Sequence, residues 1–221
     1  NGRIYIGCSR TDKIYALDAE TGERIWRFYT NGPVRFAPTV YDGRVFAGSD
    51  DGNVYCLDAE DGTLIWKCRA GYTDEKVIGN GRMISLWPVR TNVLVDNGVA
   101  YFAAGVFPYE GLYICALRCS DGSVVWVNDT IGDYAHALQY GGISPHGYLL
   151  ASQDALFVPS GRAMPAAFDK KTGEFLYYAS PGAKRGGVWA LIDKDRLVSG
   201  VDYSGTPEKV AYDTETRSEE R

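Results

Sequence analysis

The sequence ALDAETGERIW, residues 16–26, decides the fold because the 221-residue chain repeats it in altered form. The further copies are CLDAEDGTLIW from Cys56, ALRCSDGSVVW from Ala116, AFDKKTGEFLY from Ala167 and a last trace, AYDTETRSEER, from Ala211. Their starts are 40, 60, 51 and 44 residues apart, so one unit carries variable insertions. A period in this range is typical of β-propeller blades and of helical-hairpin solenoids.

Residue type favours strands over helical hairpins. The chain has 16 Tyr and 26 Gly, and its apolar runs are short, alternating and bounded by Gly, Asp and Asn, as half-buried strands require. The second unit predicts strands at 34–41, 44–48, 53–57 and 63–67, with Asp42-Gly43 and Asp51-Gly52 as hairpin turns. Four hairpin-linked strands per unit predict an all-β protein, a β-propeller of four-stranded antiparallel blades.

The repeated phrase falls on the hairpin between the third and fourth strands of each unit. We expect its Asp to accept hydrogen bonds from turn amides, its Gly to take the left-handed conformation, and its Trp to pack where neighbouring blades meet. The residues given this structural role, rather than ligand contact, are Asp18, Gly22, Trp26, Asp58, Gly62, Trp66, Gly122, Trp126, Asp169 and Gly173.

The complete copy, Ala16-x-Asp18-x-x-Thr21-Gly22-x-x-x-Trp26, resembles the tryptophan-docking repeat of the pyrroloquinoline quinone (PQQ) dehydrogenase superfamily. Through its repeats the resemblance covers essentially the whole chain. It implies a propeller of eight blades, and it includes both quinone-dependent enzymes and cofactor-free propellers that are secreted or periplasmic. It therefore also implies a periplasmic, secreted or envelope-associated location.

The cofactor site would separate these two classes. The resemblance implies that an enzyme holds PQQ between a Trp and a disulfide of two adjacent cysteines, with Ca²⁺ on Glu, Asn and Asp. The five cysteines are at positions 8, 56, 68, 115 and 119, so no two are adjacent. We expect no cofactor and a non-catalytic platform that binds a protein or a small anion. The alternative is a segment of a PQQ- and calcium-dependent dehydrogenase whose cofactor site lies mostly outside this chain.

The two ends of the chain predict partial blades. Gly2 to Ile6 reads as the second strand of its blade, and the chain stops after a third strand at about residues 209–213. Three complete blades with partial blades at both ends are fewer than the usual four to eight. We therefore expect residues 1–221 to be one incomplete propeller domain whose partners include the remaining blades.

Charge and hydropathy narrow the classes of partner. The net charge of −5 argues against nucleic acid, and no stretch of 18 apolar residues predicts a transmembrane segment. Cys56 and Cys68 are expected on the two arms of one hairpin, where either a disulfide or free buried thiols would fit.

A cationic residue recurs where each unit enters its first strand. Pro33-Val34-Arg35 and Pro88-Val89-Arg90 begin ten residues before Gly43 and Gly98, and Pro145-His146 and Lys184-Arg185 fall at nearly the same place. Arginine recognises carboxylates and phosphates through a bidentate fork. The sequence thus predicts an anion site at the channel mouth formed by Arg35, Arg90, His146 and Arg185. The alternative is that these residues pair with acids of neighbouring blades.

Overall fold

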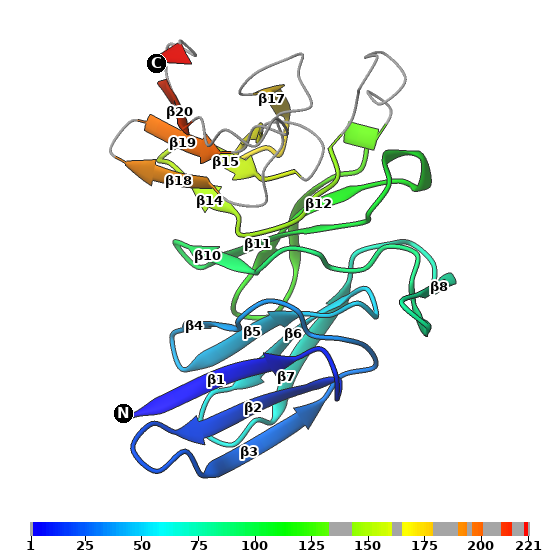
Figure 1. The fold of residues 1–221 in the computed structure, drawn as a ribbon, viewed down its shortest axis with the longest axis vertical. Coiled ribbons are helices and arrows are strands. Elements are labelled where there is room, and N and C mark those ends of the chain that lie inside the picture. The colour runs from blue at the N-terminus through cyan, green and yellow to red at the C-terminus, as the bar shows by residue number, and fades with distance from the viewer. Residues whose placement is uncertain are drawn as a thin grey trace.

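The computed structural model describes residues 2–132, 143–160, 165–178, 190–193, 196–200, 209–213 and 219–220. In this part of the chain, five antiparallel sheets of three or four strands follow one another in chain order (Figure 1). Each sheet runs in order from its first to its last strand, so every connection is between neighbours. The prediction of an all-β fold with four-stranded antiparallel sheets is confirmed.

The strands have the following bounds. The first sheet contains β1 (Arg3–Cys8), β2 (Lys13–Asp18) and β3 (Arg24–Tyr29). The second contains β4 (Thr39–Tyr41), β5 (Arg44–Gly48), β6 (Asn53–Asp58) and β7 (Leu64–Arg69). The third contains β10 (Leu94–Asp96), β11 (Val99–Ala104), β12 (Tyr113–Arg118) and β13 (Val124–Asn128). The fourth contains β14 (Leu150–Ala151), β15 (Ala155–Val158), β16 (Ala166–Asp169) and β17 (Phe175–Tyr178). The fifth contains β18 (Ala190–Asp193), β19 (Arg196–Gly200), β20 (Lys209–Asp213) and β21 (Glu219–Glu220).

Local turn chemistry explains why the first two strands of a sheet pair in one register. Asp42 and Gly43 have φ of 48° and 69°, and Asn97 and Gly98 have φ of 48° and 76°. Two consecutive residues with positive φ form the type I′ turn, whose twist matches that of the flanking strands. These turns set the pairing of Thr39 with Phe46 in the second sheet.

The core lies between the sheets rather than within one of them. Phe46, Trp66, Phe102 and Cys115 belong to one buried cluster that joins the second and third sheets, and similar clusters join the other neighbouring pairs. Because both faces of an inner sheet are covered, its middle strands are apolar throughout, and β11 is buried from Ala100 to Ala104.

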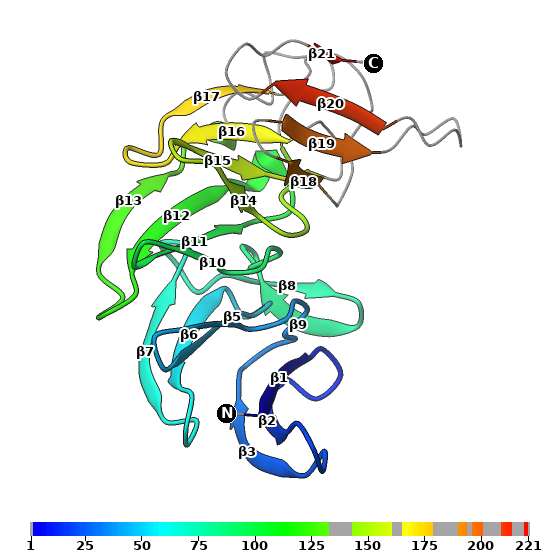
Figure 2. The same ribbon diagram turned by 90° about the vertical axis from the view of Figure 1, so that its left-hand side faces the viewer.

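The first strands β4, β10, β14 and β18 lie one above another in Figure 1. Contacts join β4 to β10 and β14 to β18. The fourth strands β7 and β13 lie on the opposite, left-hand side in Figure 2. The first strands thus line the side on which neighbouring sheets converge.

Two strand predictions were wrong. The first strand of the second sheet was predicted at 34–41 but is Thr39–Tyr41, because the prolines at 33 and 38 have no N–H to donate to a ladder. The last sheet has a fourth strand, since β21 pairs with β20. The five residues between them fall within the usual length of a hairpin loop. The described chain therefore contains four four-stranded sheets and one three-stranded sheet, not three complete and two partial blades.

The insertion at residues 71–87 lies between β7 and β10. It contains its own hairpin, formed by β8 (Lys76–Gly79) and β9 (Arg82–Ser85). Asn80 and Gly81 have φ of 52° and 73° and make the tight turn. A guanidinium nitrogen of Arg82 donates to the carbonyl oxygen of Ser9 at 3.0 Å, which ties this hairpin to the first sheet.

The tryptophans of the repeated phrase make the same contact at three junctions between sheets. The indole nitrogens of Trp26, Trp66 and Trp126 donate to the carbonyl oxygens of Ala59, Cys119 and Lys170 in the next sheet, at 3.1, 3.0 and 3.1 Å. A Cβ atom on the phrase glycine of that next sheet, Gly62, Gly122 or Gly173, would lie 2.7, 2.7 or 2.3 Å from the indole ring. These glycines thus let each hairpin lie flat on the tryptophan of the preceding sheet.

Candidate functional site

The predicted cationic residues occupy one equivalent position in successive sheets. Arg35 precedes Thr39 of β4 by four residues, Arg90 precedes Leu94 of β10 by four, and His146 precedes Leu150 of β14 by four. Arg185 lies outside the described residues. The shared spacing means that each entry segment delivers its side chain to the same end of the first strands.

Backbone contacts bring these entry segments together. The amide of Val89 donates to the carbonyl of Ser49 at 3.1 Å, and the amide of Gly147 donates to the carbonyl of Arg90 at 3.3 Å. A Cβ on Gly48 would lie 2.3 Å from Cγ1 of Val89, so only glycine there allows the segment of the third sheet to pack this closely on β5.

Arg35 and Arg90 converge on a single carboxylate, that of Asp50, which follows β5. Nε and Nη2 of Arg35 each lie 2.7 Å from Oδ2 of Asp50. Nε of Arg90 lies 2.9 Å from Oδ1. Neither of these last two atoms has a hydrogen-bond partner, so the Arg90 contact is an ion pair without a well-directed hydrogen bond. We call Arg35, Asp50, Arg90 and His146 the entry cluster.

The carboxylate of the entry cluster is buried, whereas its two guanidinium groups are partly exposed. The Asp50 side chain has no exposed surface, whereas the Arg35 and Arg90 side chains are 27% and 16% exposed. Two guanidinium groups therefore face one carboxylate, and part of each remains accessible to a solute.

His146 completes the entry cluster from the fourth sheet. Its ring packs edge-on against Phe36, which follows Arg35, with a centroid distance of 5.7 Å. Burial lowers the pKa of His146, and the charges of Arg90 and Arg35 lower it further. Burial of the Asp50 carboxyl raises its pKa, although the positive charges of Arg90 and Arg35 act in the opposite direction. His146 is thus held neutral at pH 7 and can donate or accept a hydrogen bond there.

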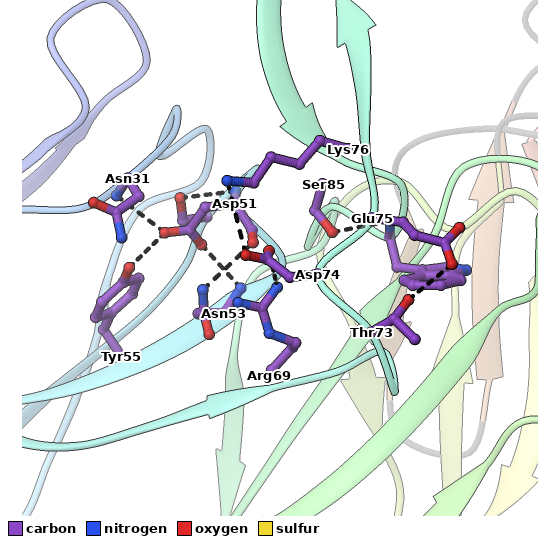
Figure 3. A network of polar contacts seen from close by, with 12 residues as sticks. Asn31, Asp51, Asn53, Tyr55, Arg69, Thr73, Asp74, Glu75, Lys76 and Ser85 are labelled. Atoms are coloured by element: carbon purple, nitrogen blue, oxygen red, sulfur yellow. Dashed lines mark hydrogen bonds and ion pairs between the residues drawn. The ribbon is translucent and has the colours of Figure 1, made fainter.

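Asp50 is the residue that the sequence reasoning missed. It lies in the run Ser49-Asp50-Asp51-Gly52, which reads as an ordinary hairpin turn. Only Asp51 acts in that way. Its carboxylate accepts hydrogen bonds from the amides of Asn31 and Asn53, at 3.0 and 2.9 Å, and from the hydroxyl of Tyr55 (Figure 3). The signal available in the sequence was a second acid beside the one that the turn requires.

The insertion hairpin borders this polar region. Arg69 on β7 lies 2.5 Å from Oδ1 of Asp74, and Lys76 lies 3.8 Å from Oδ2 of the same residue (Figure 3). These ion pairs are exposed and connect the start of the insertion to the second sheet. They leave the guanidinium groups of the entry cluster uninvolved.

The described residues do not supply the PQQ and calcium site that the resemblance implies. Within the described residues, no group of three or more His, Cys, Asp or Glu side chains could hold a metal ion. All five cysteines are free thiols in the structure, so Cys56 and Cys68 form no disulfide. Burial raises the pKa of Cys56 to about 12 and that of Cys119 to about 11, which keeps these thiols protonated. In the described part of the chain, no helix is both long and apolar enough to cross a bilayer.

Comparison with known proteins places the fold. A family model described as outer membrane protein assembly factor BamB matches residues 1–132 and 44–183. Among curated proteins, the tetrathionate hydrolase of Acidithiobacillus ferrooxidans is 28% identical in an alignment 217 residues long that covers 90% of this chain and 37% of that enzyme.

Two solved structures share the fold. BamB from Moraxella catarrhalis matches 99% of this chain and 60% of its own, with a TM-score of 0.68 and 18% identity. The quinohemoprotein alcohol dehydrogenase of Comamonas testosteroni matches 95% of this chain and 38% of its own, with a TM-score of 0.67 and 18% identity. The chain thus spans between 37% and 60% of the length of these relatives.

Proposed function

This chain belongs to the BamB-like family of PQQ-repeat propellers, and we propose that it is a non-catalytic platform that binds a small anion at the entry cluster. The convergence of Arg35 and Arg90 on the single carboxylate of Asp50 supports this proposal best. One carboxylate neutralises one guanidinium, so the cluster carries a surplus of positive charge. The chain as a whole is acidic, with a net charge of −5.

Partial burial strengthens the attraction between this surplus positive charge and an anion. Water is partly excluded around Arg90, whose side chain is 16% exposed, and electrostatic attraction is stronger where the effective dielectric constant is lower. Nε of Arg90 is buried beside Oδ1 of Asp50, so a ligand would meet the exposed 16% of the Arg90 side chain. His146 adds a neutral donor. An oxyanion between these groups would receive charge-assisted hydrogen bonds from two different sheets.

The name of one relative agrees with an anionic ligand. Tetrathionate hydrolase acts on tetrathionate, a sulfur oxyanion with two negative charges, and it is 28% identical to this chain. We extend to this chain only the chemical class of that ligand. We also propose a cell-envelope location, from the family description as an outer membrane assembly factor, and that residues 1–221 form part of a longer propeller.

Anion titration of the purified protein tests the proposal. Calorimetry with tetrathionate and with citrate measures the affinity of the wild type, of an Arg35→Ala, Arg90→Ala variant, and of Asp50→Asn. We expect the double variant to lose binding and Asp50→Asn to bind more tightly, because the competing internal carboxylate is neutralised. If the cluster only joins the sheets, all three proteins give the same weak response, and the proposal is wrong.

A second candidate function is docking of a partner protein, which the family description as an assembly factor favours. The β8–β9 hairpin presents Ile78 and Met83, which are paired across the strands and are 76% and 58% exposed. Exposed apolar side chains on a protruding hairpin are typical of interaction sites. Loss of partner binding in an Ile78→Glu, Met83→Glu variant that keeps anion affinity would favour this candidate.

The third candidate is a segment of a quinone-dependent dehydrogenase, favoured only by the likeness of fold to the Comamonas enzyme. Reconstitution with PQQ and Ca²⁺ tests it directly. Reduction of an artificial acceptor by an alcohol or a sugar would support this candidate against the non-catalytic platform.

A further inference from the structure

Two equivalent grooves lie beside the repeated phrases, at the end of the sheets opposite the entry cluster. They differ in charge. The groove between the first and second sheets is lined by Arg3, Tyr5, Gly43, Asp58, Ala59 and Glu60. The groove between the second and third sheets has a volume of about 360 Å³, and its lining includes Asp42, Arg44, Asn97, Gly98, Arg118 and Ser120. We call them the acidic groove and the basic groove.

The grooves are equivalent because their floors are built in the same way. Arg3 begins β1, and its Nη1 donates to the carbonyl of Ala59 at 2.7 Å. Arg44 begins β5, and its Nη1 donates to the carbonyl of Cys119 at 2.5 Å. These carbonyls are the ones that accept the indole N–H groups of Trp26 and Trp66.

The walls differ because one copy of the repeated phrase departs from the others. Asp58 and Glu60 line the acidic groove, whereas the corresponding positions of the basic groove are Arg118 and Ser120. The formal charges of Arg3, Asp58 and Glu60 give the acidic groove a net charge of −1. Those of Asp42, Arg44 and Arg118 give the basic groove a net charge of +1. Asp121 is a further acid near Arg118.

The same substitution removes an acceptor that the other copies possess. Oδ1 of Asp18 accepts hydrogen bonds from the amides two and three residues later, at 2.9 and 2.8 Å. Asp58 and Asp169 do the same. The side chain of Arg118 has no oxygen to accept these hydrogen bonds, and the amides of Ser120 and Asp121 have no acceptor among the described residues. Oδ1 of Asp121 instead accepts the amide of Ser123 at 2.9 Å.

We propose that the basic groove binds the carboxylate of a small-molecule ligand, which takes the place of the aspartate carboxylate that this repeat lacks. The free amides of Ser120 and Asp121 supply two donors to one carboxylate oxygen, as the equivalent amides do for Asp18. Arg118 and Arg44 supply the positive charge. Backbone amides and guanidinium groups are the usual donors to a carboxylate.

Arg118 is free enough to turn toward such a ligand. It is exposed, its one hydrogen bond is to Oγ of Ser123 at 3.1 Å, and it forms no ion pair within 4 Å among the described residues. Arg44 is fixed by Cys119 and marks the floor of the groove. The ligand therefore meets one fixed and one adjustable guanidinium.

Titration of the full chain with succinate, followed through the ¹⁵N amide signals, tests the proposal. We expect the signals of Ser120 and Asp121 to shift and saturate, and those of Glu60 and Asp61 to stay in place. Arg118→Asp restores the repeat, so the introduced carboxylate should occupy both amides and weaken succinate binding at least tenfold without unfolding the protein. No shift in the wild type, or an equal shift in Arg118→Asp, would overturn the proposal.

Matched variants separate this site from others. Arg44→Gln should weaken the shift, whereas Arg3→Gln makes the same change in the acidic groove and should leave it intact. An Arg35→Gln, Arg90→Gln variant should also leave it intact, so failure at the entry cluster and failure at the basic groove are distinguishable. A tetraglutamate peptide forms a second arm. Binding of succinate supports a free carboxylate, and binding of the peptide alone would overturn that source in favour of a protein side chain.

Discussion

The two ends of the sheets are built on different principles. At the end with the repeated phrases, three tryptophans donate to three carbonyls of the next sheet at 3.0 to 3.1 Å, each against a glycine. At the end with the entry segments, Arg35 and Arg90 share one carboxylate that has no counterpart in the next sheet. In the third sheet the position equivalent to Asp50 is Gly105. Its amide donates to the carbonyl of Pro88, just as the amide of Asp50 donates to the carbonyl of Pro33.

This difference separates architecture from specificity. A contact that recurs at three junctions between sheets stabilises the stack as a whole, and repeat proteins gain stability from such nearest-neighbour terms. A residue that occurs once, such as Asp50 or Arg118, breaks the symmetry of the repeat and makes one place on the surface unlike the others. The proposed sites both lie where the repeat is broken.

Trp66→Ala should have the largest effect, because it removes the central contact of the phrase end. The indole is 9% exposed and packs with Phe46 in the cluster between the second and third sheets. Truncation of a buried aromatic residue costs about 3–5 kcal/mol. Urea denaturation measures the loss. A loss below about 1 kcal/mol would show that the sheets do not depend on this contact.

Gly122→Ala should follow, and Gly22→Ala provides its control. Both glycines have positive φ, 74° and 72°. Because alanine is strained in this left-handed conformation, each substitution should lower the stability by about 1–2 kcal/mol. Only at Gly122 would the new Cβ lie 2.7 Å from the Trp66 ring. Overpacking of that kind adds roughly 1–3 kcal/mol. Equal losses in thermal unfolding of the two variants would contradict the docking role of Gly122.

Asp50→Asn probes the entry end and should destabilise the protein less. Removal of one partner from a buried ion pair costs up to about 5 kcal/mol, but both arginines here are partly exposed and the amide remains a hydrogen-bond acceptor. We expect a loss of roughly 1–2 kcal/mol after this discount for solvent screening. Chemical denaturation checks it, with Asp51→Asn as a comparison at the neighbouring carboxylate. A gain in stability would mean that desolvation of Asp50 outweighs its pairing.

Arg90→Gln should produce the smallest effect, a rise in the pKa of His146. In the folded protein this pKa is lowered by burial and by Arg90 and Arg35. The unfolded chain therefore takes up the proton first on acidification, so His146 reduces stability as the pH falls through about 6.5. NMR titration of the imidazole gives the pKa in both proteins. An unchanged pKa would place Arg90 too far from His146 to share a ligand.

Most of the fold could be predicted from sequence because it follows from local chemistry repeated many times. Each hairpin depends only on residues close in sequence. The signals are the Asp42-Gly43 turn, the alternation of apolar and polar residues along the strands, and the repeated phrase. The β8–β9 hairpin was equally local and could have been found from Asn80-Gly81. The short strand β21 could not, since two residues carry no periodicity.

The candidate site could be predicted only in part. The register of the entry segments placed Arg35, Arg90 and His146 at equivalent positions because it depends on spacing alone. Spacing does not reveal which acid they meet. Asp50 and Asp51 are adjacent in sequence, yet one accepts turn amides and the other meets two guanidinium groups from different sheets.

The sequence by itself determined the all-β architecture and the hairpin turns of the repeated phrase, because hairpins and turns are short-range structures. Only the tertiary structure decided that Arg35 and Arg90 face a common carboxylate, and that Arg44 and Arg118 share a groove. Those encounters join residues 55 and 74 positions apart. Their geometry depends on how each sheet is rotated onto the next, and the packing of tryptophan on glycine is one of the contacts that set this rotation.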